Sequence, residues 1–325
     1  MSVSVAADVR EGGTWTPRQR LKNGALYAVV RAALSIVRRA PRAVVALLCR
    51  ALGLLAWVLL ARERSLVRAR LAAGLGQPVP ARRVRAVFLA AGDVLADTLA
   101  LLDPRERAGR TMTMDAASHA VLRDALDEGR GVVYVAAHLG PWERMAALLA
   151  EEGFPVVTIA RESYDPRLTA LYERLRAPRR VRSIYRGRPG AVTSIVRELR
   201  AGRGVGFLID LPSRVQSIRA PLFGAEARIP VGAARIALAR GAAVVVGTPV
   251  PSDTQGLLCL VIERIPTSDL APGPMDEAKL TTRLARALEA RIAARPEAWL
   301  GLFAPPPPPD AEPTAPQLRC HDDPR

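Results

Sequence analysis

Hydrophobic residues are concentrated in two long segments near the start of the chain. Ala25–Val37 and Ala43–Ala61 stand on either side of a short basic break, and the residues before them are polar. The second segment is almost long enough to cross a bilayer, but Arg50 at its centre would cost at least a few kcal/mol in lipid. The pattern predicts a polar leader over 1–23 and hydrophobic, membrane-associating helices over 24–61, which lie in the interface, pack on the protein or span the bilayer.

The remaining chain changes from a helical to an alternating pattern. Residues 62–128 carry apolar positions at helical spacing. After Gly131, short apolar runs alternate with amphipathic segments, which is typical of an α/β domain with a mostly parallel central sheet flanked by helices. The expected strands are 131–137, 155–160, 182–185, 204–209, 242–249 and 257–262, and the expected helices are 141–152, 166–176, 191–200, 231–239 and 275–295. We assign 62–303 to this domain and the proline-rich 304–325 to a disordered tail.

Charge narrows the choice of partners. Lys and Arg number 47 against 31 Asp and Glu, a formal net charge of +16, which indicates nucleic acid, an anionic membrane surface or an acidic substrate. Aromatic residues make up only 4% and are not interleaved with basic ones, which argues against nucleic acid. The arginines beside the apolar segments suit anionic headgroups, or else they solvate ordinary helices. They are Arg38, Arg39, Arg42, Arg62, Arg64, Arg68 and Arg70.

Cysteine usage is sparse. Cys49, Cys259 and Cys320 are far apart, odd in number and without ligand spacing. This distribution favours a reducing compartment and argues against a structural metal.

The strongest candidate chemistry lies where an apolar strand ends in a lone histidine. His138 follows the run Val132–Ala137 and precedes Gly140-Pro141, so we expect it at the carboxyl end of a strand, where ligand sites of open α/β sheets gather. Glu143 would lie in the first turn of the next helix. We interpret the pair as a general base and its orienting carboxylate. Neutral His138 takes a proton from an acceptor hydroxyl, while Glu143 fixes the ring tautomer and stabilises the imidazolium. The structural alternative is a histidine that caps the helix.

The sequence around this histidine resembles a known family. His138-Leu139-Gly140-Pro141-Trp142-Glu143 is similar to the His-x4-Asp/Glu signature of lysophospholipid acyltransferases. It is closest to the bacterial late lipid A acyltransferases (lauroyl and myristoyl transferases), a group that includes phosphatidylinositol mannoside acyltransferases. Further similar segments extend the resemblance over about residues 25–303: Arg62–Leu71, Thr158–Arg161 with Asp165–Leu168, Val205–Asp210 with Pro221–Gly224, 230–249 and Pro296–Leu300.

The chain departs from the family at two places. No basic aromatic ending follows Trp299, and the loop after Asp210 lacks a second Asp two positions on. Both differences concern recognition of the acceptor rather than the reaction.

The resemblance implies an O-acyltransferase at the cytoplasmic face of the bacterial inner membrane. Such an enzyme moves a fatty acyl chain from acyl carrier protein or acyl-CoA to a hydroxyl of an anionic glycolipid, similar to a lipid A precursor, or of a lysophospholipid. It uses no covalent acyl-enzyme, no metal and no other cofactor.

The resemblance also assigns binding residues. It implies that Arg161 contacts a phosphate of the acceptor or donor, that Asp210 orients Arg161 or holds an acceptor hydroxyl, and that Arg214 flanks an anionic headgroup. Gly224 is expected in a tight turn beside the site. Backbone N–H groups near Gly140 are candidates for stabilising the oxyanion.

Three other functions stay open on the sequence. A catalytically inactive lipid- or membrane-binding relative fits the altered residues after Asp210 and Trp299, although the intact His138–Glu143 pair argues against it. A hydrolase would use water in place of the acceptor. A nucleic-acid-binding protein is suggested only by the charge and would show a steep salt dependence of affinity.

Overall fold

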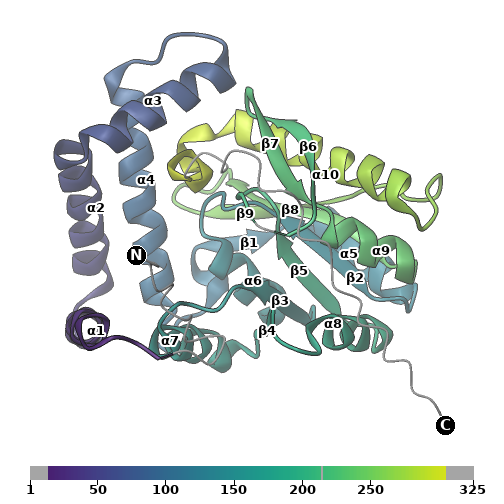
Figure 1. Ribbon diagram of the computed structural model, residues 1–325, viewed down its shortest axis with the longest axis horizontal. Helices are drawn as coiled ribbons and strands as arrows, with labels where there is room; N and C mark the ends of the chain where they lie inside the picture. The colour runs from purple at the N-terminus through teal and green to yellow at the C-terminus, as the bar shows by residue number, and fades with distance from the viewer. Residues whose placement is uncertain (1–13, 214, 305–325) are drawn as a thin grey trace, which may run out of the picture.

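The computed structural model describes residues 14–213 and 215–304 and has an α/β architecture (Figure 1). One sheet contains β1 (Met112–Met114), β2 (Val132–Ala136), β3 (Val156–Ala160), β4 (Arg182–Tyr185), β5 (Gly204–Leu208), β8 (Ala243–Pro251) and β9 (Leu258–Arg264). A separate hairpin is formed by β6 (Ser217–Leu222) and β7 (Ala225–Pro230). The helices are α1 (Pro17–Val37), α2 (Arg42–Leu59), α3 (Ala61–Leu75), α4 (Ala81–Ala100), α5 (Ala116–Asp127), α6 (Trp142–Glu151), α7 (Pro166–Arg176), α8 (Ala191–Arg200), α9 (Gly232–Arg240) and α10 (Pro274–Ala294).

The strand order β1-β9-β8-β2-β5-β3-β4 creates a switch point at the centre of the sheet. The five strands from β8 to β4 are parallel, and β9 runs antiparallel to β8. From β2 the chain reaches β3 through α6 on one face, whereas from β5 it reaches β8 through the hairpin and α9 on the other face. The crevice at the carboxyl ends of β2 and β5 is therefore the expected ligand site. The prediction of a mostly parallel sheet flanked by helices is confirmed.

The core lies on both faces of β2. Val133 and Val135 pack in one cluster with α9 and α10, and Val132 and Tyr134 pack in the other with α6. Burial on both faces explains why this strand reads as an uninterrupted apolar run in the sequence.

Helices α1 to α4 lie beside the sheet, at the left of Figure 1. Helix α2 buries Val45, Cys49 and Gly53 at four-residue intervals against α4. An added Cβ would lie 2.3 Å from the Phe88 carbonyl oxygen at Gly53, and 2.4 Å from that of Cys49 at Gly92. The two helix backbones therefore touch at points where only glycine fits.

Replacing Gly92 by Ala is expected to lower the free energy of unfolding by about 1–3 kcal/mol, because the methyl group meets backbone rather than a movable side chain. In an unobstructed helix the same change stabilises by about 0.5–1 kcal/mol. Gly24→Ala in α1 is the matched control, since nothing lies within 4 Å of its added Cβ. Thermal unfolding of both variants in detergent measures the difference, and a stabilised Gly92→Ala variant would contradict the close contact.

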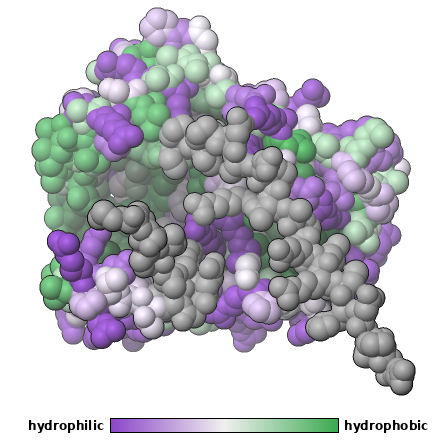
Figure 2. Space-filling model, viewed as in Figure 1, coloured by the Kyte–Doolittle hydropathy of each residue, from purple (hydrophilic) through white to green (hydrophobic). Residues whose placement is uncertain are grey.

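The outer face of α2 is apolar and uncovered. Within the described residues, this is the one helix that is long and apolar enough to cross a membrane, judged by length and composition alone. Its exposed side chains include Leu47, Leu48, Leu52, Leu55, Val58 and Leu59. Figure 2 shows a hydrophobic surface on the left side of the molecule, where Figure 1 places α2. Arg50 lies 3.3 Å from Asp93 of α4, so an ion pair compensates the central charge of α2.

Several elements differ from the sequence predictions. Helix α1 begins at Pro17, inside the predicted polar leader, because Thr16 and Gln19 exchange side-chain-to-backbone hydrogen bonds in a capping box. Strand β1 and the β6–β7 hairpin were not anticipated. Residues 1–13 of the leader and 305–325 of the predicted tail lie outside the described residues.

Candidate active site

Strand register brings His138 and Asp210 together. Strands β2 and β5 pair from Val132 opposite Gly204 to Ala136 opposite Leu208. Two more residues along each strand place the histidine opposite the aspartate. Asp210 Oδ1 lies 2.8 Å from His138 Nδ1, and Oδ2 accepts the His138 backbone N–H at 2.9 Å. The carboxylate is completely buried, so it holds both the ring and the main chain of His138 in place.

A third donor completes the environment of this carboxylate. Trp299 Nε1 donates to Asp210 Oδ2 at 2.8 Å. An ionised carboxylate is the acceptor that suits three donors, and the contact at Nδ1 assigns the ring proton to that nitrogen. The neutral ring then carries its lone pair on Nε2, and His138 lines a cleft of about 960 Å³. An oriented imidazole with a free lone pair at a cleft wall is the arrangement of a general base.

Glu143 is not the ring-orienting partner that the sequence predicted. It is buried and forms a two-pronged ion pair with Arg176, at 2.6 and 2.9 Å. Gly140 adopts φ +62°, and the turn leaves the edge of the Trp142 ring against His138, with ring centroids 4.9 Å apart. Glu143, which follows Trp142, points about 100° further round the helix, toward α7. Glu143 therefore joins the start of α6 to the end of α7.

The Glu143–Arg176 pair also shapes the local electrostatics. Burial works against the guanidinium charge, but the adjacent carboxylate holds the pKa of Arg176 above its ordinary value. Burial first, and then the negative charge of Glu143, raises the pKa of Tyr172 at the same cleft. The guanidinium of Arg176 therefore keeps its charge, and the tyrosine stays neutral.

Arginines are among the residues that line the cleft. Arg235 pairs with Glu277 at 2.9 Å, whereas Arg161 and Arg186 have no acidic partner among the described residues. Burial, and then the like charge of Arg161, lowers the pKa of Arg186. The buried Asp210 faces His138 and does not orient Arg161, so that expectation is wrong.

Gly140 and Gly224 do not line the cleft. The Gly140 N–H donates to the Ala298 carbonyl oxygen at 2.9 Å, so it is not free to stabilise an oxyanion. Gly224 forms the tight β6–β7 turn with φ +73°, but the turn packs against Ala73 of α3 instead of lining the cleft. Arg214 lies outside the described residues.

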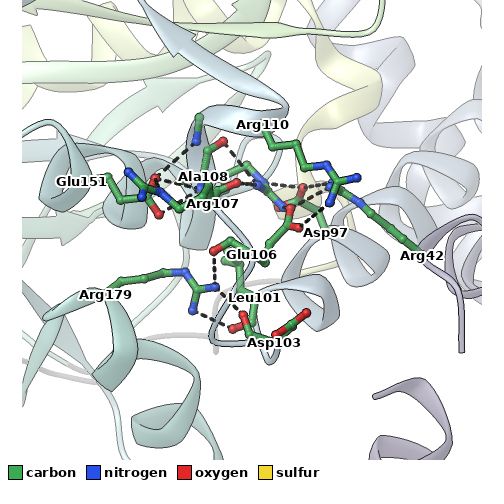
Figure 3. A network of polar contacts seen from close by, with 12 residues as sticks. Arg42, Asp97, Leu101, Asp103, Glu106, Arg107, Ala108, Arg110, Glu151 and Arg179 are labelled. Carbon is green, nitrogen blue, oxygen red and sulfur yellow. Dashed lines mark hydrogen bonds and ion pairs between the residues drawn. The ribbon is translucent and has the colours of Figure 1, made fainter. Parts of the chain in front are cut away.

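A buried ionic network fixes α6 behind the site (Figure 3). Arg144 is fully buried and donates to Asp97 Oδ1 at 2.6 Å and to Glu106 Oε1 at 3.0 Å. Its Nη1 donates to both backbone carbonyls of residues 107–108. Arg42 at the start of α2 also contacts Glu106, at 2.7 Å. The network therefore ties the first turn of α6 to the N-terminal helices.

Sequence reasoning found His138 but missed Trp299 and the true role of Asp210. Their spacing could have indicated that His138 and Asp210 lie side by side, because each stands six residues after the start of its strand. Trp299 carried no such signal, since it reaches the site from beyond α10.

The fold and the site define an α/β protein that holds an oriented histidine at the wall of a large cleft. The family model for bacterial lipid A biosynthesis acyltransferases matches residues 16–303. The chain therefore belongs to this acyltransferase family, and the resemblance noted in the sequence is confirmed. A search of curated proteins gave no significant match.

Proposed function

We propose that the protein transfers a fatty acyl chain from acyl carrier protein or acyl-CoA to a hydroxyl of a membrane glycolipid or lysophospholipid. The acceptor is anionic and resembles a lipid A precursor. The observation that carries this proposal is the oriented His138–Asp210 dyad at the wall of a large cleft, in a chain of the lipid A acyltransferase family.

The reaction uses His138 first as a base and then as an acid. Nε2 takes the proton of the acceptor hydroxyl while the oxygen attacks the thioester carbonyl carbon. As the tetrahedral intermediate collapses, the C–S bond breaks and the imidazolium returns the proton to the departing thiolate. The products are an ester and a free thiol. The Asp210 carboxylate stabilises the imidazolium through its contact with Nδ1, and the step needs no cofactor besides the acyl thioester.

An apolar cavity beside the cleft suits the acyl chain. It has a volume of about 80 Å³ and lies between the sheet and α6, beside Tyr134, Met145, Leu149 and Gly206. Trp142, Glu143, Ile159, Arg176, Phe207 and Leu208 line both the cavity and the cleft. We place the end of the acyl chain here, with its thioester near His138.

Arg161 and Arg186 suit the phosphates of the substrates. The guanidinium groups of Arg161 and Arg186 line the cleft without an acidic partner among the described residues. Arginine presents donors that match phosphate oxygens. We assign the phosphate of the acceptor or of the acyl carrier to these two arginines.

The uncovered face of α2 supports contact with the membrane. Its exposed leucines and valines form an apolar surface beside exposed arginines at both ends of the helix, including Arg38, Arg39 and Arg62. Apolar burial together with cations at the headgroup level is typical of a membrane-bound helix. We propose that this face binds the cytoplasmic surface of the bacterial inner membrane.

The deciding experiment offers labelled acyl carrier protein and acyl-CoA to membranes containing the wild-type chain or His138→Ala, with a panel of lipid extracts. A labelled lipid formed only by the wild type supports the proposal, and its mass identifies the acceptor. Release of free fatty acid without a lipid product indicates a hydrolase. Absence of any product from folded, membrane-bound protein indicates an inactive lipid-binding relative.

Gly206→Val is expected to shorten the acyl chain that the enzyme prefers. The position faces the cavity opposite Tyr134 and Thr158, and an added Cβ meets no atom closer than 3.8 Å. Each methylene that the new side chain displaces should lower the rate with long chains about fourfold, from about 0.8 kcal/mol of burial. Competition between long and short donors measures this. An equal loss for every chain length would place the acyl chain elsewhere.

A further inference from the structure

The geometry points to Trp299 as a positioning residue that acts on His138 through Asp210. This inference rests on the proposed role of His138 as a general base. The indole N–H donates to Asp210 Oδ2 at 2.8 Å, and the same oxygen accepts the His138 backbone N–H at 2.9 Å. The His138 ring packs against Trp142 and the Trp299 ring against Phe223, so the effect of the indole on the base passes through the carboxylate.

The segment that carries Trp299, residues 298–300, also binds the loop at residues 138–140 through its backbone. Leu139 and Trp299 form an antiparallel bridge. On either side of it, the Gly140 N–H donates to the Ala298 carbonyl and the Leu300 N–H donates to the His138 carbonyl, each at 2.9 Å. The indole and the main chain therefore hold His138 as one unit, which makes a rigid path from this segment to the base.

This segment is anchored in turn by the N-terminal helices. Arg70 of α3 donates to the carbonyl oxygens of Gly301 and Leu302 at 3.0 and 3.1 Å. Phe303 packs edge-on against Phe88 of α4, with ring centroids 5.0 Å apart. The position of Trp299 is therefore set by α3 and α4, outside the sheet that carries His138 and Asp210.

The indole restricts the carboxylate in a way that the sheet alone does not. Without Trp299, Oδ2 keeps only the His138 main-chain donor, and the Asp210 side chain gains freedom to rotate about χ2. Rotation takes Asp210 Oδ1 away from His138 Nδ1. It thereby removes the contact that holds the ring proton on Nδ1 and keeps Nε2 unprotonated. The buried indole N–H thus holds the dyad in its productive arrangement.

The test is Trp299→Phe in the full-length membrane enzyme. We expect kcat to fall about 10–100-fold, the size of one hydrogen bond to a charged group, with KM for both substrates nearly unchanged. In an Asp210→Ala background the same substitution should cause almost no further loss, because the residue through which it acts is gone. Equal losses in the two backgrounds, or an effect on KM alone, would overturn the inference.

Two further variants separate positioning from folding. Gly92→Ala destabilises the contact between α2 and α4 away from the Trp299 segment, and it should lower the melting temperature with kcat nearly unchanged. If Trp299→Phe does not fold, benzothienylalanine at position 299 keeps the ring shape and removes only the N–H, and the same loss of kcat is expected. Wild-type transfer that survives His138→Ala would instead refute the proposed function itself.

Discussion

Asp210→Asn is expected to reduce acyl transfer almost as severely as His138→Ala, by about 10²–10⁴-fold in kcat. Two donors, the His138 N–H and the Trp299 indole, converge on Oδ2. In the variant they hold the amide oxygen of the new side chain at that position and turn its NH₂ group toward His138 Nδ1. The ring must then accept at Nδ1 and carry its proton on Nε2, where a general base needs a lone pair. The expected loss of acyl transfer thus follows from the reversed tautomer of His138.

Steady-state kinetics and ¹⁵N NMR of the histidine rings test this prediction together. The wild type should show His138 protonated at Nδ1 when neutral, and Asp210→Asn should show it protonated at Nε2. Asp115→Asn is the matched control, because Asp115 caps α5 by accepting the Ser118 N–H at 2.6 Å, a role that Asn performs equally well. Substantial activity with the reversed tautomer would show that His138 is not the base.

The sequence placed His138 correctly at the end of a strand, but its partner was assigned to the wrong carboxylate. Alternating strands and helices identified His138 at a strand end. The assignment of Glu143 assumed that an acid near in sequence is near in space. Parallel strands instead bring together residues far apart in the chain, and the neighbour of β2 is β5, 72 residues further on for the pair His138 and Asp210. Strand order depends on tertiary packing, which local periodicity does not encode.

Two further elements were missed for different reasons. Trp299 reaches Asp210 because the chain after α10 returns to pair with Leu139, a single bridge with no strand pattern. The β6–β7 hairpin alternates apolar and polar residues, as in Ser217-Ile218-Arg219-Ala220, but Pro221 within β6 argues against a strand. Strands β2 and β8, which are almost fully buried, were predictable from their apolar runs, whereas β1 and the β6–β7 hairpin were not.

Replacing Arg144 by Met is expected to lower the free energy of unfolding by about 3–5 kcal/mol, because it leaves buried carboxylates without their main cation. Arg144 is inaccessible to solvent and pairs with Asp97 and Glu106. The control is Arg107→Met, which removes an exposed guanidinium 3.4 Å from Glu151 and should cost less than about 1 kcal/mol. Thermal unfolding in detergent compares the two, and similar losses would show that the buried network contributes little.

The loss of stability caused by Arg144→Met should depend on pH. Burial raises the pKa of Asp97, and the charges of Arg144 and Arg42 limit that rise. Because the folded pKa lies above the unfolded one, protonation of Asp97 favours the folded state. This contribution is complete at low pH and is lost as pH rises through the folded pKa. Without Arg144 the pKa of Asp97 rises further, so the destabilisation should be larger at about pH 7.5 than at about pH 5. A penalty that stays constant between these conditions would mean that Asp97 keeps its charge without Arg144, with Arg42 as the cation that compensates it.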